Sequence, residues 1–213
     1  MKSYGQYCSV AKALDVVGDR WTLLIVRELL TQGPSRYTDL RAGLPGIASN
    51  LLSTRLKEME AAGLITRTAA PPPIATALFD LTARGRELKD VLYSLGRWGL
   101  DFMVTADGSD AFRSNWFIFA TETFLTDTDP AAPDVTIGLS ATDAAPVHIV
   151  VGHGEVELKK GAAPDPDLAL AGEPRLIMGV LSGKLPLEKA RAAGLSVTGD
   201  PSVLARAVPA RSA

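Results

Sequence analysis

The sequence predicts an α+β protein of two domains. Its 213 residues are 46% hydrophobic and 22% charged, which is enough to bury two modest cores. Charge is unevenly divided, because residues 1–105 carry 13 Lys and Arg against 10 Asp and Glu, whereas residues 106–213 carry 9 against 14. A turn-rich segment follows Thr105, so we place the boundary near Asp107 and expect domains of residues 1–106 and 107–213.

Helical spacing of apolar residues marks four segments in the first half, residues 8–17, 21–30, 35–41 and 49–62. The second segment is apolar on almost every side and is expected at the centre of the domain. Pro45 must end the third, since proline disfavours helical geometry in the residue before it, and Gly63 caps the fourth. Two short helices around the tight turn at 44–47 form a helix-turn-helix.

The fourth segment has two contrasting faces. Leu52, Leu56 and Met59 share an apolar face, while short hydrogen-bonding and cationic groups gather opposite, toward the end that enters a major groove in this motif. Asn can pair with adenine, Ser and Thr with several base edges, and Lys or Arg with phosphates. The residues expected to contact DNA are Arg36, Ser49, Asn50, Ser53, Thr54, Arg55, Lys57 and Arg67. A solvated surface helix would show similar residues, and that alternative stays open at this point.

A hairpin follows the fourth helix. Residues 64–68 and 77–81 alternate as strands, joined by a Pro-rich tip at 69–76. A β-wing occupies this place in a winged helix-turn-helix domain, and Arg67 is its natural contact to a phosphate or the minor groove.

Thr82 is expected to cap a long final helix. Its apolar stripe is too long for so small a domain to cover, which predicts homodimerisation through it. The stripe consists of Leu88, Val91, Leu92, Leu95, Trp98, Phe102 and Met103.

Six strings of residues, in order and without a large gap, resemble the HxlR family of bacterial winged helix-turn-helix regulators. They are residues 8–14 (CSVAKAL), 18–25 (GDRWTLLI), 36–40 (RYTDL), 44–47 (LPGI), 52–65 (LSTRLKEMEAAGLI) and 81–85 (LTARG). The resemblance covers about residues 8–100. It implies a homodimer on a pseudo-palindromic operator of double-stranded DNA, with each fourth helix in a major groove and each wing near the backbone.

Some members of this family sense oxidants or electrophiles through a cysteine at the position of Cys8. Proline usually follows that cysteine, whereas Ser9 follows here. A thiol at the start of a helix can become reactive, although a lone cysteine is more often a small buried hydrophobe. A redox-responsive regulator is therefore an alternative reading. As the single cysteine, Cys8 excludes a disulfide within the chain.

The second half predicts a small α+β domain. Residues 111–125 form one helix, with several short antiparallel strands after it and a tight turn at 152–154. The strands are expected at 134–139, 147–151, 155–159, 168–171 and 195–198. Helices with proline at an early position are expected at 174–182, 186–193 and 201–208.

The stretches 167–174, 181–194 and 197–201 resemble sterol carrier protein domains, a likeness that spans about residues 134–208. It implies an apolar tunnel for a small hydrophobic ligand. The residues expected to line it are Phe117, Phe124, Ile177, Val180, Leu181, Leu185 and Leu187. The same residues would also suit an ordinary filled core.

Other classes of function find little support. His148 lies in a strand and His153 in a turn, with no nucleophile or phosphate-loop motif nearby, so we expect neither an enzyme nor a metal or cofactor. No signal peptide or membrane span is seen, which favours the cytoplasm. The main hypothesis is a dimeric DNA-binding transcriptional regulator. The rivals are a hydrophobic-ligand carrier and an interaction protein with an inherited winged fold.

Overall fold

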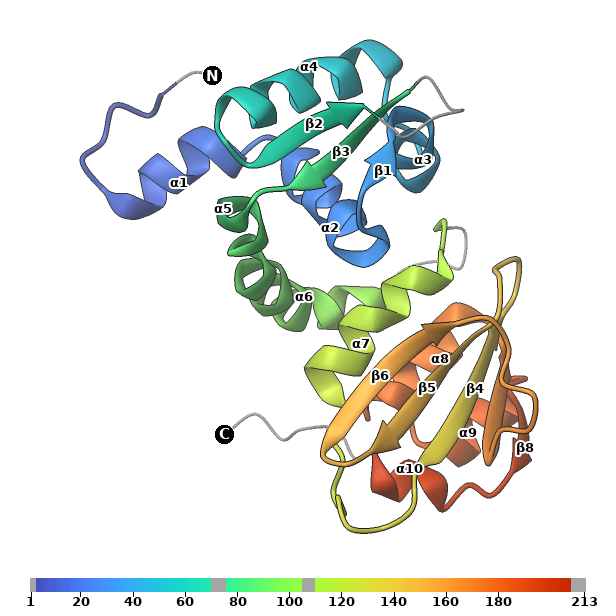
Figure 1. Ribbon diagram of the computed structural model, residues 1–213. Helices are drawn as coiled ribbons and strands as arrows, with labels where there is room; N and C mark the ends of the chain where they lie inside the picture. Colours follow the sequence, from blue (N-terminus) through green and yellow to red (C-terminus); the bar gives the residue numbers. More distant parts are fainter. Residues whose placement is uncertain (1–2, 70–75, 105–109, 208–213) are drawn as a thin grey trace. The chain divides into compact units, whose positions relative to one another are not determined.

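A computed structural model describes residues 3–69, 76–104 and 110–207 (Figure 1). The chain forms two compact units, residues 1–95 and 96–213, which divide within one long helix. The boundary expected near Asp107 lies outside the described residues and stays a prediction.

The N-terminal unit is a winged helix-turn-helix domain. Its elements are α1 (Ser9–Val17), α2 (Thr22–Gln32), β1 (Ser35–Arg36), α3 (Tyr37–Gly43), α4 (Ser49–Ala61), β2 (Ile65–Ala69), β3 (Ala77–Leu81), α5 (Ala83–Arg86) and the start of α6 (Leu88–Val104). The antiparallel sheet has the order β1-β3-β2. As expected, α2 is central, since Ile25, Val26 and Leu29 are fully buried. The wing is confirmed, although the interior of its Pro-rich tip, residues 70–75, lies outside the described residues.

Two local expectations in this unit were wrong. The third helix begins at Tyr37 and not at Ser35, because Ser35 and Arg36 pair with Phe79 and Leu78 as a short strand. The final helix is interrupted: Thr82 Oγ1 accepts a hydrogen bond from Gly85 N at 3.0 Å and so caps only α5. Helix α6 then starts at Leu88.

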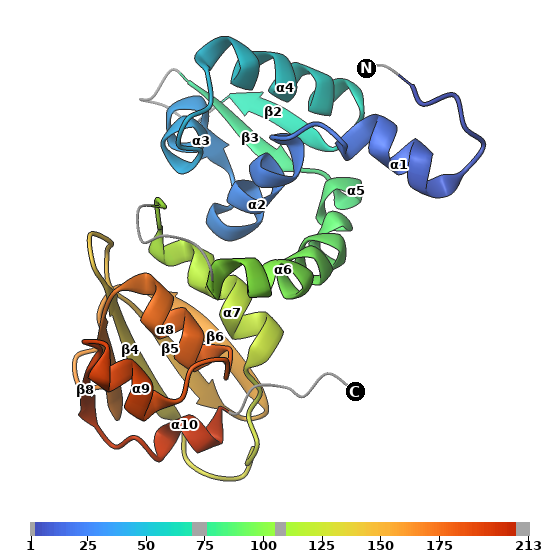
Figure 2. The same ribbon diagram turned by 180° about the vertical axis from the view of Figure 1, so that it is seen from behind.

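The C-terminal unit is a five-stranded sheet with helices on one face. After η1 (Ser114–Trp116), its elements are α7 (Phe117–Phe124), β4 (Val135–Ala141), β5 (Val147–Gly152), β6 (Glu155–Lys160), β7 (Leu168–Gly172), α8 (Pro174–Leu181), α9 (Leu187–Ala192), β8 (Ser196–Gly199) and α10 (Val203–Arg206). Helix α7 packs against β6 and α8, and α8 packs against β4 and β7. Figure 2 shows α8 and α9 in front of the sheet.

Three expectations for this unit needed correction. Residues 111–113 are not helical, because the backbone is still extended at Arg113 (φ −138°, ψ 137°). The last helix spans only Val203–Arg206. The sheet order is β6-β5-β4-β7-β8, and β7 pairs with β4 in parallel, so the sheet is mixed.

The residues expected to line an apolar tunnel belong to one hydrophobic core. Phe117, Ile177, Val180 and Leu181 are buried in it, and the other three, Phe124, Leu185 and Leu187, pack against it. This packing favours the filled core over the tunnel, because the side chains that would enclose a ligand contact the core instead.

Candidate nucleic-acid interface

The turn before α4 is held by buried apolar side chains. Leu44 and Ile47 are buried, and Ile47 N donates to Leu44 O at 3.2 Å. Between them Gly46 has φ +84°, a conformation that glycine adopts without strain. The turn therefore fixes the angle at which α4 leaves α3.

Helix α4 presents a polar face to solvent. Leu52, Leu56 and Met59 are buried as predicted, which anchors one side of the helix to the core. The opposite side is exposed and carries Ser49, Asn50, Ser53, Thr54 and Lys57. Five of the eight predicted DNA contacts thus share one accessible surface.

Hydrogen bonds order the first turns of α4. Tyr37 OH donates to Ser49 O at 2.7 Å and ties the start of α3 to the start of α4. Thr54 Oγ1 donates to Asn50 O at 3.0 Å, and Asn50 Oδ1 accepts from Leu51 N at 2.9 Å. The Thr54 proton is thereby used inside the helix, whereas the amide NH2 of Asn50 stays available to a base edge.

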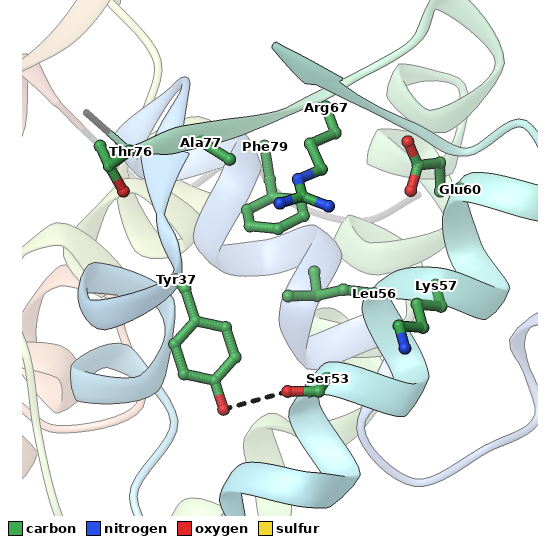
Figure 3. Close-up of a pocket in the computed structure, with 9 residues that line it drawn as sticks. All are labelled: Tyr37, Ser53, Leu56, Lys57, Glu60, Arg67, Thr76, Ala77 and Phe79. Atoms are coloured by element: carbon green, nitrogen blue, oxygen red, sulfur yellow. Dashed lines mark hydrogen bonds between the residues drawn. The ribbon is translucent and has the colours of Figure 1, made fainter. Parts of the chain in front are cut away.

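A groove of about 300 Å³ separates α4 from the wing (Figure 3). The pairing of β2 with β3 sets Arg67 opposite Phe79, and the Arg67 guanidinium carbon lies 5.9 Å from the centre of the Phe79 ring. The groove is lined by Tyr37, Ser53, Leu56, Lys57, Glu60, Arg67, Thr76, Ala77 and Phe79. Within the described residues, neither Lys57 nor Arg67 has an ion-pair partner.

The other two predicted contacts are placed differently. Arg55 forms ion pairs with Asp19 and, at 2.6 Å, with Glu58, and its side chain is only 16% exposed. The Arg55 guanidinium therefore faces the protein and holds α4 in place. Arg36 is half-buried at the N-cap of α3, where its backbone N–H donates to Asp39 Oδ2 at 3.2 Å.

Sequence reasoning missed Tyr37, Glu60 and Phe79. The Tyr37–Ser49 hydrogen bond joins residues 12 apart, and Arg67 meets Phe79 only through the wing register. Alternation in the two wing strands could have suggested that Arg67 meets Phe79. No local signal in the sequence marks the Tyr37–Ser49 hydrogen bond.

Cys8 is exposed at the N-cap of α1. Hydrogen bonds from the backbone N–H groups of Ala11 and Val10 lower the pKa of its thiol, because they stabilise the thiolate. The alternative of a buried hydrophobe is therefore wrong for this cysteine.

The two histidines lie in the C-terminal unit, away from any cluster of acids or thiols that could hold a metal among the described residues. His148 Nδ1 is 2.9 Å from Gly161 O, and His153 occupies a turn with φ +55°. No described helix is both long and apolar enough to cross a membrane.

Comparison with known proteins identifies the N-terminal unit. Residues 16–107 match the HxlR-like helix-turn-helix family. An uncharacterized HTH-type transcriptional regulator of Synechocystis sp. is 33% identical over 99 residues, 46% of this chain and 73% of the relative. The chain belongs to the HxlR-like family.

Two further relatives of this HxlR-like chain cover the same part. The uncharacterized HTH-type transcriptional regulator YvaP of Bacillus subtilis is 34% identical over 43% of this chain and 84% of its own length. The solved structure of the redox regulator HypR in its reduced form is 27% identical, covers 44% of this chain and 92% of that one, and has a TM-score of 0.40. The relatives from Synechocystis and Bacillus subtilis are described as HTH-type transcriptional regulators. Most of the C-terminal unit lies beyond the family match.

Proposed function

We propose that this HxlR-like protein is a transcriptional regulator that binds double-stranded DNA in a sequence-specific manner in the cytoplasm. The observation that carries the proposal is the exposed polar face of α4 beside a groove with two cations, Lys57 and Arg67, that have no ion-pair partner among the described residues. Base edges are read by short polar side chains in the major groove, and phosphates are held by cations. Both kinds of group are present on one surface.

The predicted contacts divide into two roles. Asn50, Ser49 and Thr54 are proposed to meet base edges, because they face solvent in the first half of α4. Ser53 lies on the groove beside the two cations. Lys57 and Arg67 are proposed to hold phosphates, with Arg36 beside the backbone. Arg55 is assigned to the support of α4, since its charge is already neutralised by two carboxylates.

We also propose that the protein acts as a homodimer on a pseudo-palindromic operator. All the large apolar side chains that stand exposed among the described residues belong to two segments. Tyr4, Tyr7, Val10 and Leu14 lie on the N-terminal arm and α1, and Val91, Leu95, Trp98, Phe102 and Met103 lie on α6. Of the predicted stripe, Leu92 is buried within the chain and Leu88 is half-buried. Burial of these surfaces against a second copy would remove them from water.

A gel-shift titration tests DNA binding. The probe is duplex DNA from the protein's own upstream intergenic region, with scrambled duplex as competitor, at low and at physiological salt. We expect a shift that resists the competitor and an affinity that falls steeply with salt, because bound cations release counterions from DNA. Equal binding to both duplexes would contradict base readout.

A redox-responsive regulator is the second candidate, favoured by the exposed thiol of Cys8 and its lowered pKa. Treatment with diamide, a thiol oxidant, is expected to change the operator affinity of the wild type but not of Cys8→Ser. If both proteins respond alike, oxidant sensing does not pass through this thiol.

Modulation by a small hydrophobic ligand in the C-terminal unit, and its likeness to sterol carrier domains, remain predictions. The filled core weakens them and also weakens the rival carrier function. Solvent extraction of the purified protein followed by mass spectrometry decides the matter. A stoichiometric lipid would support the carrier reading, and its absence would leave the second unit an interaction domain.

A further inference from the structure

The groove between α4 and the wing has the composition of an anion site. We propose that it seats a single DNA phosphate, which Lys57 and Arg67 hold together. This inference rests on the proposed DNA binding and goes beyond it, because it assigns both cations to the same phosphate. It also gives Tyr37, Ser53 and Glu60 defined parts in that contact.

The two cations reach the groove from opposite walls. Lys57 extends from α4 and Arg67 from β2, and both side chains line the groove (Figure 3). The Arg67 guanidinium rests over the Phe79 ring at 5.9 Å, which restricts its motion before DNA arrives. A planar guanidinium can donate two parallel hydrogen bonds to one phosphate, and an ammonium group can approach the same oxygens as a point charge.

The hydroxyl groups of Tyr37 and Ser53 form one end of the groove. Tyr37 OH donates to Ser49 O at 2.7 Å, so its proton is committed to α4. Ser53 Oγ lies 3.5 Å from Tyr37 OH, a long contact whose proton can turn to a phosphate oxygen at little cost. Ser53 is therefore assigned as a donor to the phosphate, and Tyr37 as a positioning residue.

The Glu60 carboxylate stands at the other end of the groove (Figure 3). A phosphate close to this carboxylate would be repelled, since both groups are negatively charged. Glu60 thus confines the phosphate to the end near Ser53. It also weakens the binding of DNA backbones that do not fit this position.

A shared phosphate has a consequence that two separate contacts lack. The salt slope, which is the steepness with which the logarithm of the binding constant falls with the logarithm of the salt concentration, reports the number of phosphates neutralised. Each neutralised phosphate contributes about 0.9 to it. Lys57→Ala and Arg67→Ala should each lower the slope by about 0.9 per subunit, and the double variant should lower it by about the same amount, because only one phosphate is lost. Two independent phosphates would double the reduction.

The deciding experiment replaces phosphates one at a time. The duplex that the full-length wild type binds is first footprinted, and then carries single neutral methylphosphonates across the footprint. We expect one position per half-site at which a methylphosphonate weakens binding by the wild type roughly tenfold. At that position the affinities of Lys57→Ala for the modified and the unmodified duplex should differ by no more than about twofold, and the same should hold for Arg67→Ala. Lys159→Ala, which removes a charge from β6, is the control and should behave as wild type.

The outcomes separate the two proposals. If the wild type shows no competitor-resistant binding, DNA recognition fails and the phosphate seat fails with it. If it binds, but the modified phosphate and the variants act independently at every position, only the shared seat is overturned. Glu60→Gln adds a second check, since it should raise affinity for scrambled duplex about threefold and so reduce the preference for the operator.

Discussion

At the scale of single residues, Arg55 and Lys57 look interchangeable in the sequence but have different surroundings. Arg55 is paired with Asp19 and Glu58, whereas Lys57 faces the groove without an ion-pair partner among the described residues. We expect Arg55→Ala to destabilise the N-terminal unit by about 1 kcal/mol and Lys57→Ala to leave its stability nearly unchanged. Lys57→Ala should weaken binding to all duplexes instead. Thermal unfolding and gel shifts of both variants check this, and equal stability losses would contradict it.

The C-terminal unit contains a buried ion pair at the same scale. Arg206 Nε lies 2.6 Å from Asp127 Oδ1, and Asp127 also accepts hydrogen bonds from Gly154 N and Asp129 N. These donors, above all Arg206, hold the pKa of Asp127 well below its ordinary value. Because its folded-state pKa is lowered, the Asp127 carboxylate stabilises the fold at pH values above the unfolded-state pKa of about 3.9. That stability is lost as the pH falls from this value toward the folded-state pKa.

Asp127→Asn tests this linkage. At neutral pH the substitution leaves Arg206 buried without its counter-charge, so the Tm of the C-terminal unit should fall by about 5 °C or more. The difference from wild type should shrink as the pH is lowered from 5 toward 2, because Asp127 of the unfolded wild type then takes up a proton while the folded form stays charged, which removes the stability that the charge contributes. Thermal unfolding across this range is the measurement. A difference that stays constant with pH would show that the carboxylate charge is irrelevant.

At the scale of elements, the position of α3 depends on a buried carboxylate. Glu28 on α2 is fully buried, accepting hydrogen bonds from Arg27 Nε at 3.0 Å and Gln32 Nε2 at 2.5 Å. A Cβ at Gly43, the last residue of α3, would lie 2.2 Å from Glu28 Oε2. Glycine is therefore needed where α3 ends, so that it can approach α2.

Gly43→Ala is expected to destabilise the N-terminal unit by about 1–3 kcal/mol and to reduce operator affinity, because α3 must shift and α4 is tied to it. Gly96→Ala on α6 is the matched control, since a Cβ there has open space and helix propensity favours alanine. Denaturant unfolding compares the two. Unchanged stability of Gly43→Ala would mean that the carboxylate can move aside freely.

The elements also show which features the sequence could predict. The buried face of α4 follows directly from the spacing of Leu52, Leu56 and Met59. The β5–β6 turn was predictable too, since His153 and Gly154 have φ of +55° and +83°, as a two-residue hairpin turn demands. The parallel pairing of β4 with β7 and the Arg55–Asp19 ion pair were not, because both join distant segments and leave no local pattern. For the DNA interface, the residue types in the sequence indicated α4. Only the fold shows that Arg55 is paired within the protein whereas Lys57 faces the groove.

At the scale of the whole molecule, DNA binding cannot come from net charge. The chain has a formal net charge of −2 and an acidic second half. The affinity for DNA must then arise from a few cations at defined positions. A second copy of the chain would supply the same cations again and so double the number of phosphates that the protein contacts. We therefore expect the proposed function to depend on dimerisation.

Trp98→Glu tests that expectation. Val91, Leu95, Trp98 and Phe102 follow one face of α6 at helical spacing, and the Trp98 and Phe102 rings meet edge to face at 5.0 Å. Trp98 is 69% exposed, so the substitution should fold, yet it places a charge in the proposed dimer interface. Sedimentation should show a monomer where the wild type is a dimer, with operator affinity lowered by about 100-fold because half-sites are no longer bound together. Asp90→Lys, on the polar flank of α6, should remain dimeric. A Trp98→Glu protein that is still dimeric and still binds would place the interface elsewhere, on the exposed face of α1.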